Sequence, residues 1–269
     1  MKAELGVVGY PIAHSLSPQL HNAAYQELDF AANYQKFEVP SGKFVDFIEN
    51  HRELAGLSIT MPHKFAAFSI AENLDKHAEL TGAANTLKRN TDNTWSAYNT
   101  DVYGIIQALS NAKQVINSKA KVAVLGGGAT AMSAFCALAD LGFSNIDLFL
   151  RSPNKAIDII KLAKQLNINC TIKNLNEEIK ANYLISTLPQ DSIKSYKNNL
   201  DLTKTSLAFD VNYNPWPSEL GKYCAAAKVE IIPGIDMLLH QAVKQVQIYT
   251  GTTRNSAEIL STMRKSVKK

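Results

Sequence analysis

The stretch that most constrains the fold is "KVAVLGGGATAMSAFCALADLG", residues 121–142. A short apolar strand runs directly into a glycine-rich turn, and an apolar segment of helical character follows. Glycines suit such a turn because it is tight, and because a side chain would keep the backbone away from a pyrophosphate bound at the start of the helix. The GxGxxA spacing at Gly126, Gly128 and Ala131 therefore predicts a dinucleotide-binding βαβ unit.

A glycine-rich turn can also serve packing alone, so its surroundings matter. Further strand-like runs follow the predicted helix in regular alternation with amphipathic segments, which is typical of a parallel sheet covered by helices. This alternation favours nucleotide binding over a packing turn. The runs are "IDLFL" at 146–150, "YLIST" at 183–187, "LAFDV" at 207–211 and "VEIIP" at 229–233.

The residues after the first of these runs, at 146–150, indicate which dinucleotide is bound. NAD-binding units place Asp or Glu there, about 20 residues beyond the loop, to bind the ribose 2′-hydroxyl. This chain instead reads "LFLRSPNK", which offers Arg151, Ser152 and Lys155 and no carboxylate. Because a guanidinium pairs with a phosphate through two hydrogen bonds, the sequence predicts NADP, with solvated loop charges as the alternative.

The chain is long enough for two domains, since its 269 residues exceed the ~100–200 of a usual single domain. The first hundred residues form an alternating α/β series of their own, and two helices without an intervening strand end the chain. We expect an α/β protein with a substrate-binding catalytic domain on a mostly parallel sheet, a Rossmann-type NADP-binding domain, and C-terminal helices that return to the first domain. The predicted bounds are 1–104, 105–236 and 237–269.

Composition excludes several classes of protein. Hydrophobic residues make up 46% and charged residues 19% of the chain, which is ordinary for a folded globular protein. No apolar run approaches the ~18 residues of a membrane span, and no secretory signal opens the sequence. We expect a cytoplasmic protein without membrane partners.

The net charge and the cysteines exclude further classes of partner. The net charge of +4 is small, and the basic C-terminal residues look like a solvated helix end rather than a nucleic-acid-binding arm. Cys136, Cys170 and Cys224 are widely spaced and lack the pairing typical of metal ligands. We expect reduced thiols, no metal and no nucleic-acid partner.

Polar residues gather in three parts of the predicted first domain, where strands or helices begin and end. In an open α/β sheet ligands bind beyond the carboxyl ends of the strands, so these side chains are candidates for one site. Taken singly, each has an ordinary reading: Ser17 as a helix N-cap, Asn85 in a turn, Asp101 at a helix start, Lys64 on the surface. The candidates are Ser15, Ser17, Thr60, Lys64, Asn85 and Asp101.

Together these residues form a site for a small polyol, with one cation and one carboxylate. An enzyme that oxidises an alcohol with a nicotinamide must move the hydroxyl proton while the hydride leaves, so it needs a positioned acid or base. Lys64, at the end of "GLSITMPHK", fits that role, and Asp101 is the carboxylate that would hold it in place.

The chain resembles the shikimate dehydrogenase family over nearly its whole length. The resemblance is carried, in order, by "GYPIAHSLSPQLHN", "SITMPHK", "GAANTL", "NTD", "VLGGGATA", "DVNYNPWP" and "GIDMLLHQA". It implies reversible NADPH-dependent reduction of 3-dehydroshikimate to shikimate, on the route to chorismate and the aromatic amino acids. A quinate/shikimate dehydrogenase that uses NAD or both cofactors, and a non-catalytic ligand-sensing relative, stay open as alternatives, as does a homodimer.

The resemblance also implies a role for each matching residue. Ser15 and Ser17 would bind the substrate carboxylate, and Lys64 with Asp101 would form the catalytic pair. The ring hydroxyls would be held by Thr60, Asn85, Asp101 and Gln241, with Tyr213 lining the site; simple core packing is the alternative for Tyr213 and Met237. The implied cofactor contacts are Gly126, Gly127, Gly128, Ala129, Thr130, Ala131, Arg151, Ser152, Lys155, Thr187, Gly234 and Met237.

Four departures from the family pattern stand out. Ser58 replaces a frequent asparagine, which changes a support of the substrate site. The other three fall in the nucleotide-binding half and bear on cofactor contacts more than on the chemistry. They are Ala129 for a loop glycine, Leu150 for an asparagine before Arg151, and "STLP" at 186–189 for a more frequent "NAT".

Overall fold

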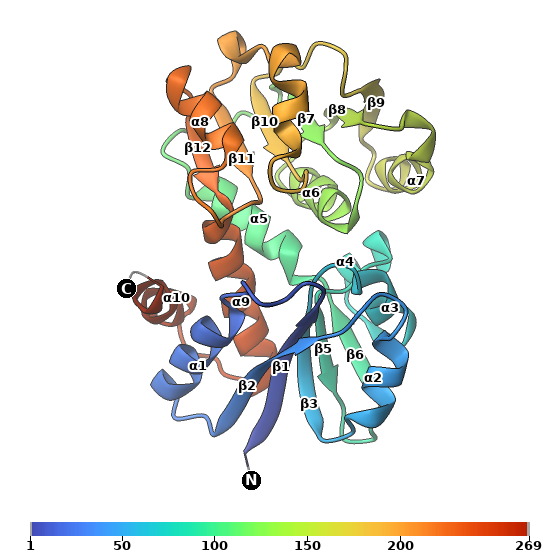
Figure 1. The fold of residues 1–269 in the computed structure, drawn as a ribbon, viewed down its shortest axis with the longest axis vertical. Helices are drawn as coiled ribbons and strands as arrows, with labels where there is room; N and C mark the ends of the chain where they lie inside the picture. The colour runs from blue at the N-terminus through green and yellow to red at the C-terminus, as the bar shows by residue number, and fades with distance from the viewer. Residues whose placement is uncertain (1, 268–269) are drawn as a thin grey trace. The chain divides into compact units, whose positions relative to one another are not determined.

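The computed structural model describes residues 2–267, apart from the side chain of Lys155. The chain forms two compact units: unit 1 takes the residues up to Gly104 and those from Leu239 onward, and unit 2 takes Ile105–Leu238. Each unit contains one sheet with its own helices (Figure 1). The predicted two-part α/β fold is confirmed, including the C-terminal helices that belong with the first part. Lys268 and Lys269, from the basic end of the chain, lie outside the described residues.

Unit 2 contains a six-stranded sheet in the order β12-β11-β10-β7-β8-β9, in which every pair of neighbours is parallel. This is the doubly wound order, and the strand order reverses between β7 and β10, where such sheets bind ligands. The strands are β7 (Val122–Leu125), β8 (Asn145–Leu150), β9 (Asn169–Asn174), β10 (Tyr183–Ser186), β11 (Leu207–Asp210) and β12 (Glu230–Pro233).

The central strands of this sheet are buried on both faces, which is why they read as continuous apolar runs in the sequence. The edge strand β9, "NCTIKN", is partly exposed, and the sequence analysis missed it because it lacks such a run. The covering helices are α6 (Ala129–Asp140), α7 (Ile157–Gln165) and α8 (Glu219–Ala226), with short 3-10 helices η1 (Pro153–Lys155), η2 (Ser192–Asn199) and η3 (Leu202–Lys204).

Unit 1 contains a mixed sheet in the order β2-β1-β3-β5-β6-β4. Strand β1 is parallel to both β2 and β3, whereas β5 is antiparallel to β3 and to β6. The β5–β6 hairpin falls in the polar stretch "LKRNTDNTW", residues 87–95. The strands are β1 (Ala3–Gly9), β2 (Ala32–Glu38), β3 (Leu54–Ile59), β4 (Asn73–Leu74), β5 (Thr86–Arg89) and β6 (Trp95–Tyr98).

The helices of unit 1 cover both faces of this sheet, and α10 packs against α1 (Figure 1). Two long helices cross the boundary between the units in sequence: α5, which leaves unit 1, and α9, which returns to it. The helices are α1 (Ser17–Glu27), α2 (Phe44–Asn50), α3 (Lys64–Ser69), α4 (Lys76–Thr81), α5 (Thr100–Ser110), α9 (Gly234–Thr250) and α10 (Ser256–Ser266).

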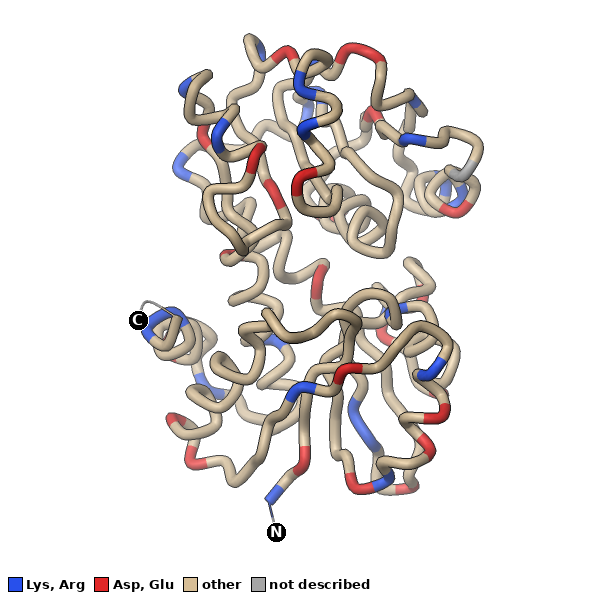
Figure 2. Tube along the Cα trace, viewed as in Figure 1, with Lys and Arg blue, Asp and Glu red and all other residues tan. Residues whose placement is uncertain are grey.

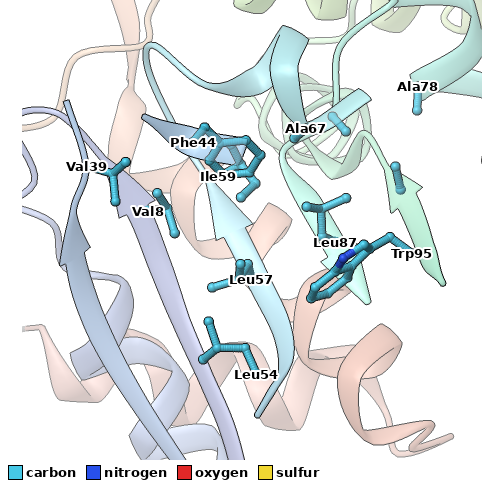
Figure 3. Packing of buried hydrophobic residues seen from close by; sticks show 12 residues of the cluster. Val8, Val39, Phe44, Leu54, Leu57, Ile59, Ala67, Ala78, Leu87 and Trp95 are labelled. Atoms are coloured by element: carbon cyan, nitrogen blue, oxygen red, sulfur yellow. The ribbon is translucent and has the colours of Figure 1, made fainter. Parts of the chain in front are cut away.

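Strand β3 divides its side chains between two different environments, because successive residues of a strand point to opposite faces. Leu57 and Ile59 join an apolar cluster with Phe44, on the face covered by α2 and α3 (Figure 3). Gly56 and Ser58 face the other way, toward α9. A Cβ at Gly56 would lie 2.7 Å from the ring of Tyr249, so this glycine allows α9 to approach the sheet.

Three further features of the chain are its charge distribution, the character of its helices and its cysteines. Figure 2 shows Lys and Arg interspersed with Asp and Glu along both units. Within residues 2–267, no helix combines the length and apolar character needed to cross a membrane. None of the three cysteines forms a disulfide, and burial raises the pKa of the Cys170 thiol to about 11 and that of Cys224 to about 12. Such thiols stay protonated and unreactive at neutral pH.

Candidate active site

The topology of unit 1 brings the predicted polar segments to one edge of its sheet. Strands β1 and β3 are parallel, with Val8 opposite Ile59, so both carboxyl ends lie at that edge. Strand β5 runs the other way and therefore begins there, with Thr86 opposite Ser58. Strand β6, antiparallel to β5, ends there at Tyr98. The segments that follow β1, β3 and β6, and the one that precedes β5, thus converge.

Lys64 and Asp101 meet at this edge. Lys64 is the first residue of α3, and the Ala84 N–H donates to its carbonyl oxygen at 2.9 Å, which joins α3 to the segment before β5. Asp101 lies in the first turn of α5, where a carboxylate is favoured by the helix dipole. The Lys64 Nζ donates to Asp101 Oδ2 at 2.5 Å, and the two side chains are only 15% and 7% exposed. The pair is therefore a fixed, largely desolvated feature rather than a solvated surface contact.

Asn85 orients the Asp101 carboxylate. Its Nδ2 donates to Asp101 Oδ1 at 2.7 Å, whereas Lys64 donates to Oδ2. Its Oδ1 accepts from the Thr100 backbone N–H at 2.8 Å and from the Thr86 hydroxyl at 2.8 Å. These donors fix which end of the amide faces Asp101. Asn85 therefore positions a carboxylate and does not serve only in a turn.

Gln241 reaches the same cluster from far along the chain. Its Oε1 accepts from Asn85 Nδ2 at 3.2 Å, and the residue is only 6% exposed. Helix α9 carries it, and the part of α9 from Leu239 onward belongs to unit 1. Lys64, Asn85, Asp101 and Gln241 therefore form one connected polar group.

Ser15 lies in the loop after β1, Ser17 is the first residue of α1, and Thr60 directly follows β3. The Ser17 backbone N–H donates to the Ser15 hydroxyl at 3.3 Å, so the two serines are adjacent in space. Thr60 is half-buried, and its N–H donates to the carbonyl of Val8 at 2.9 Å. All three belong to the edge at which β1 and β3 end.

The reading of Ser17 as a helix N-cap is wrong. Helix α1 begins at Ser17 itself, Leu16 takes the cap position, and no side chain caps the helix. Pro18, in the first turn, starts the helix without a cap because its fixed backbone angle suits that place. The buried Ser17 side chain instead lies near the hydroxyl of Tyr34, a buried residue of β2.

In unit 2, the glycine loop has the shape of a nucleotide cradle. Gly126 has a φ of +102°, and a Cβ there would lie 2.5 Å from Thr187 Oγ1, so only glycine fits. Gly128, the residue before α6, has an ordinary φ of −88°, and a Cβ there would meet no atom within 4 Å. Neither backbone nor packing requires that second glycine, whereas close approach of a pyrophosphate to α6 would.

Arg151 follows β8 directly, and β8 lies beside β7, whose carboxyl end leads into the glycine loop. A Cβ on Gly127 would lie 2.7 Å from Leu150, which places the residue before Arg151 against the loop. The Arg151 side chain is exposed and Ser152 is half-buried. The side chain of Lys155 lies outside the described part of the chain.

Packing accounts for several other cofactor candidates. The Thr187 hydroxyl donates to the Leu125 carbonyl at 2.8 Å and lies against Gly126. A Cβ on Gly234 would lie 2.1 Å from the carbonyl oxygen of Val211, so glycine is required there by packing. Met237 is buried within unit 2, and burial raises the pKa of the half-buried Tyr213. These contacts are compatible with ligand binding but do not demand it.

Comparison with known proteins identifies the family. Residues 7–87 match a family model described as the shikimate dehydrogenase substrate binding domain. A relative named shikimate dehydrogenase (NADP(+)) from Leptospira interrogans is 32% identical over 270 residues, which cover 96% of this chain and 92% of the relative. One of the same name from Methanocella arvoryzae is 36% identical over 256 residues, which cover 91% and 92%. This chain belongs to the shikimate dehydrogenase family.

The fold agrees with that membership. The crystal structure of the Mycobacterium tuberculosis shikimate dehydrogenase matches with a TM-score of 0.85 and 32% identity, covering 98% of this chain and 99% of the other. The chain therefore spans the length of a shikimate dehydrogenase, with both of its units included.

Sequence reasoning missed the residues that support the shikimate dehydrogenase site from inside unit 1. The strongest is Gln245, which lies one helical turn after Gln241 and so shares its face of α9. The four-residue spacing between the two glutamines was the signal that could have identified Gln245. A glutamine on the side of the helix that carries Gln241 would be buried, and a buried amide needs hydrogen-bond partners. The other missed residues, all buried, are His21, Tyr34, Thr86 and Thr100.

Proposed function

We propose that this protein catalyses the reversible NADPH-dependent reduction of 3-dehydroshikimate to shikimate, a step toward chorismate and the aromatic amino acids. The observation that carries the proposal is the desolvated Lys64–Asp101 pair, whose Nζ and Oδ2 are 2.5 Å apart at an edge lined with hydroxyl and amide groups. A site of this kind offers one proton donor and several partners for the hydroxyls of a small ring.

The substrate is held by two groups of residues in unit 1. Ser15, in the loop after β1, and the adjacent Ser17, at the start of α1, bind the carboxylate through their hydroxyl groups. The ring hydroxyls are held by Thr60, Asn85, Asp101 and Gln241. Hydrogen-bonded hydroxyls and amides suit a polyol because a ligand that lacks a matching hydroxyl leaves a buried polar group unpaired. Tyr213, in unit 2, is proposed as a further residue that lines the site.

Lys64 moves the proton. In the reduction, its ammonium group donates a proton to the carbonyl oxygen of 3-dehydroshikimate as that oxygen gains negative charge. In the reverse direction, the neutral amine accepts the proton of the hydroxyl group. Asp101 accepts a hydrogen bond from Nζ and is itself held by Asn85, so the lysine stays in one position. General acid–base catalysis of this kind contributes ~10²- to 10⁴-fold to a rate.

The cofactor NADP, when bound, supplies or takes up the hydride. The fit of unit 2 to this group rests on Gly128, where no atom of the described residues occupies the space a side chain would fill. Gly126, Gly127, Gly128, Ala129, Thr130 and Ala131 hold the pyrophosphate; Arg151, Ser152 and Lys155 hold the 2′-phosphate; and Thr187, Gly234 and Met237 lie toward the nicotinamide. No carboxylate follows β8 to repel the phosphate.

These roles assign a function to each part of the chain. Residues 1–104 are the substrate-binding catalytic domain, 105–236 the NADP-binding domain, and 237–269 the helices that pack on the substrate domain. Cysteines that form no disulfide fit a reducing compartment, the cytoplasm, and the mixed surface charge favours no nucleic-acid partner. The assembly, monomer or homodimer, is measurable by light scattering.

The test is the appearance of the reduced-nicotinamide absorbance band when the purified protein meets shikimate. NADP and NAD are run in parallel, with quinate as the alternative substrate. Rapid reduction of NADP by shikimate alone is expected. A faster reaction with quinate or with NAD would favour the dual-specificity alternative, and no signal with any pairing from folded protein would contradict the proposal.

The Arg151→Ala variant tests the choice of cofactor. A charge-assisted hydrogen bond contributes ~1.5–3 kcal/mol, so we expect the KM for NADP to rise ~10- to 100-fold, with little change for NAD. Lys161→Ala is the matched control, since it removes an exposed cation from α7 of the same unit. An unchanged ratio of kcat/KM for NADP over NAD in Arg151→Ala would show that the 2′-phosphate is held elsewhere.

A further inference from the structure

A layer of buried polar side chains lies beneath the candidate site, between the sheet of unit 1 and α9. Burying polar groups costs free energy unless each finds a partner, so a network of this size needs a reason. Its members come from α1, β2, β3, β5 and α9, far apart in the sequence. They are His21, Tyr25, Tyr34, Ser58, Thr86, Gln245 and Tyr249.

Gln245 is the central member of this layer. Its Oε1 accepts from the Ser58 hydroxyl at 2.7 Å and lies 3.1 Å from Nε2 of His21. Its Nε2 donates to the Asn85 carbonyl at 3.0 Å and to the Thr86 hydroxyl at 2.9 Å. The side chain thus makes all the hydrogen bonds an amide can make, and the residue is 1% exposed. One residue therefore ties β3, β5 and α1 to α9.

From Gln245 the network leads directly to the catalytic pair. The Thr86 hydroxyl accepts from Gln245, so its own hydrogen points to Asn85 Oδ1, 2.8 Å away. That contact helps turn Asn85 Nδ2 toward Asp101, which in turn holds Lys64. Gln245 also holds the backbone of Asn85 through its carbonyl. It acts on Asp101 through Asn85 and Thr86, without touching it.

In the other direction, the network extends toward Ser17, the first residue of α1. Ser58 accepts from the Tyr34 hydroxyl at 2.6 Å, and the Ser17 side chain lies near that hydroxyl. The departure at Ser58 thus places a hydroxyl between Tyr34 and Gln245. The two ends of the site, the serines and the Lys64–Asp101 pair, share one buried support.

We propose that Gln245 is a positioning residue, which holds Asn85, and through it Asp101, in the arrangement that the proton transfer requires. The inference rests on the proposed function. A purely structural role is the alternative, but well-packed apolar side chains stabilise such a layer as well as or better than polar ones. A polar network that ends on the catalytic pair is better explained by the precision it gives to that pair.

The test compares two glutamines of α9. Gln245→Met keeps the length of the side chain and removes its hydrogen bonds. Gln247→Met is the matched control, because Gln247 donates to the Ser256 hydroxyl at 3.0 Å, away from the site. We expect kcat for shikimate oxidation to fall ~10- to 100-fold in Gln245→Met, the cost of misplaced catalytic groups, and to stay within twofold in Gln247→Met. Both kcat values are calculated per mole of folded enzyme, and the assays are run well below the Tm measured for each variant.

A second variant covers the case in which Gln245→Met does not fold. Thr86→Val removes only the hydroxyl between Gln245 and Asn85, and should lower kcat in the same way. In the double variant the two losses should be far from additive, since both break one path. Wild-type kcat in folded Gln245→Met, or in Thr86→Val, would overturn the inference. Wild-type protein without activity would instead overturn the proposed function, which keeps the two failures distinct.

Discussion

Lys64→Met is expected to lose nearly all turnover while still binding shikimate. Removal of a general acid or base costs ~10²- to 10⁴-fold, and Lys64 is the side chain whose Nζ approaches Asp101 at the converged strand ends. We expect kcat to fall about 10³-fold. The dissociation constant for shikimate should change by less than roughly tenfold, because Ser15, Ser17 and Gln241 stay in place. Steady-state kinetics with NADP and a fluorescence or calorimetric titration of shikimate measure the two effects separately.

The matched control is Lys43→Met. Lys43 also pairs with an aspartate, Asp46, at 3.1 Å, but both side chains are more than half exposed at 67% and 61%. Exposed pairs of this kind contribute little, so this variant should retain full activity and stability. If Lys64→Met kept a kcat within tenfold of the wild type, the lysine would only orient the substrate, and the proton would pass through another group.

Acid should destabilise the protein through His21, a residue with no direct part in the chemistry. Burial lowers the pKa of His21 to about 3, and its ring stacks on Tyr34 with centroids 4.1 Å apart. The unfolded chain takes up this proton near pH 6.5, so between these values it binds more protons than the folded protein. The free energy of unfolding therefore falls as the pH falls, by about 1.4 kcal/mol per pH unit below 6.5. Denaturant unfolding from pH 7 to pH 4 measures the slope.

Two variants separate His21 from the carboxylates that also titrate in acid. His21→Gln should remove the part of the slope that is due to His21. The wild type should therefore lose about 3 kcal/mol more of its free energy of unfolding than the variant between pH 7 and pH 4. His14→Gln changes an exposed histidine of the same unit and is the control for the substitution itself. An identical pH dependence in wild type and His21→Gln would mean that the folded protein accommodates the charged imidazole.

Local sequence patterns predicted much of the fold. The apolar runs of β7, β10 and β11 are continuous because these strands are buried on both faces, and the glycine turn before α6 reads directly as a nucleotide loop. Strand β9 was not predicted because it is a half-exposed edge strand and has no continuous apolar run. A serine before a proline predicts a helix cap at Ser17, whereas the fold makes Ser17 the first residue of α1 and places its side chain near Tyr34.

The polar segments of the site were visible in the sequence, but their connections were not. Lys64 and Asp101 are 37 residues apart, and Asn85 lies 156 residues from Gln241, so no local pattern could pair them. Their meeting depends on the antiparallel turn of β5 and β6 and on the return of α9 to unit 1. The layer around Gln245 is harder still to foresee, because its members look like ordinary core or surface residues until the register of the sheet is known.

The most direct measurement is a crystal structure of the wild-type protein with shikimate bound. The account predicts that the shikimate carboxylate lies against the hydroxyls of Ser15 and Ser17, with a ring hydroxyl within ~2.6–3.2 Å of Lys64 Nζ. Asn85 should keep its hydrogen bond to Asp101. A carboxylate paired with Lys64 instead, or shikimate bound away from this edge of the sheet, would contradict it.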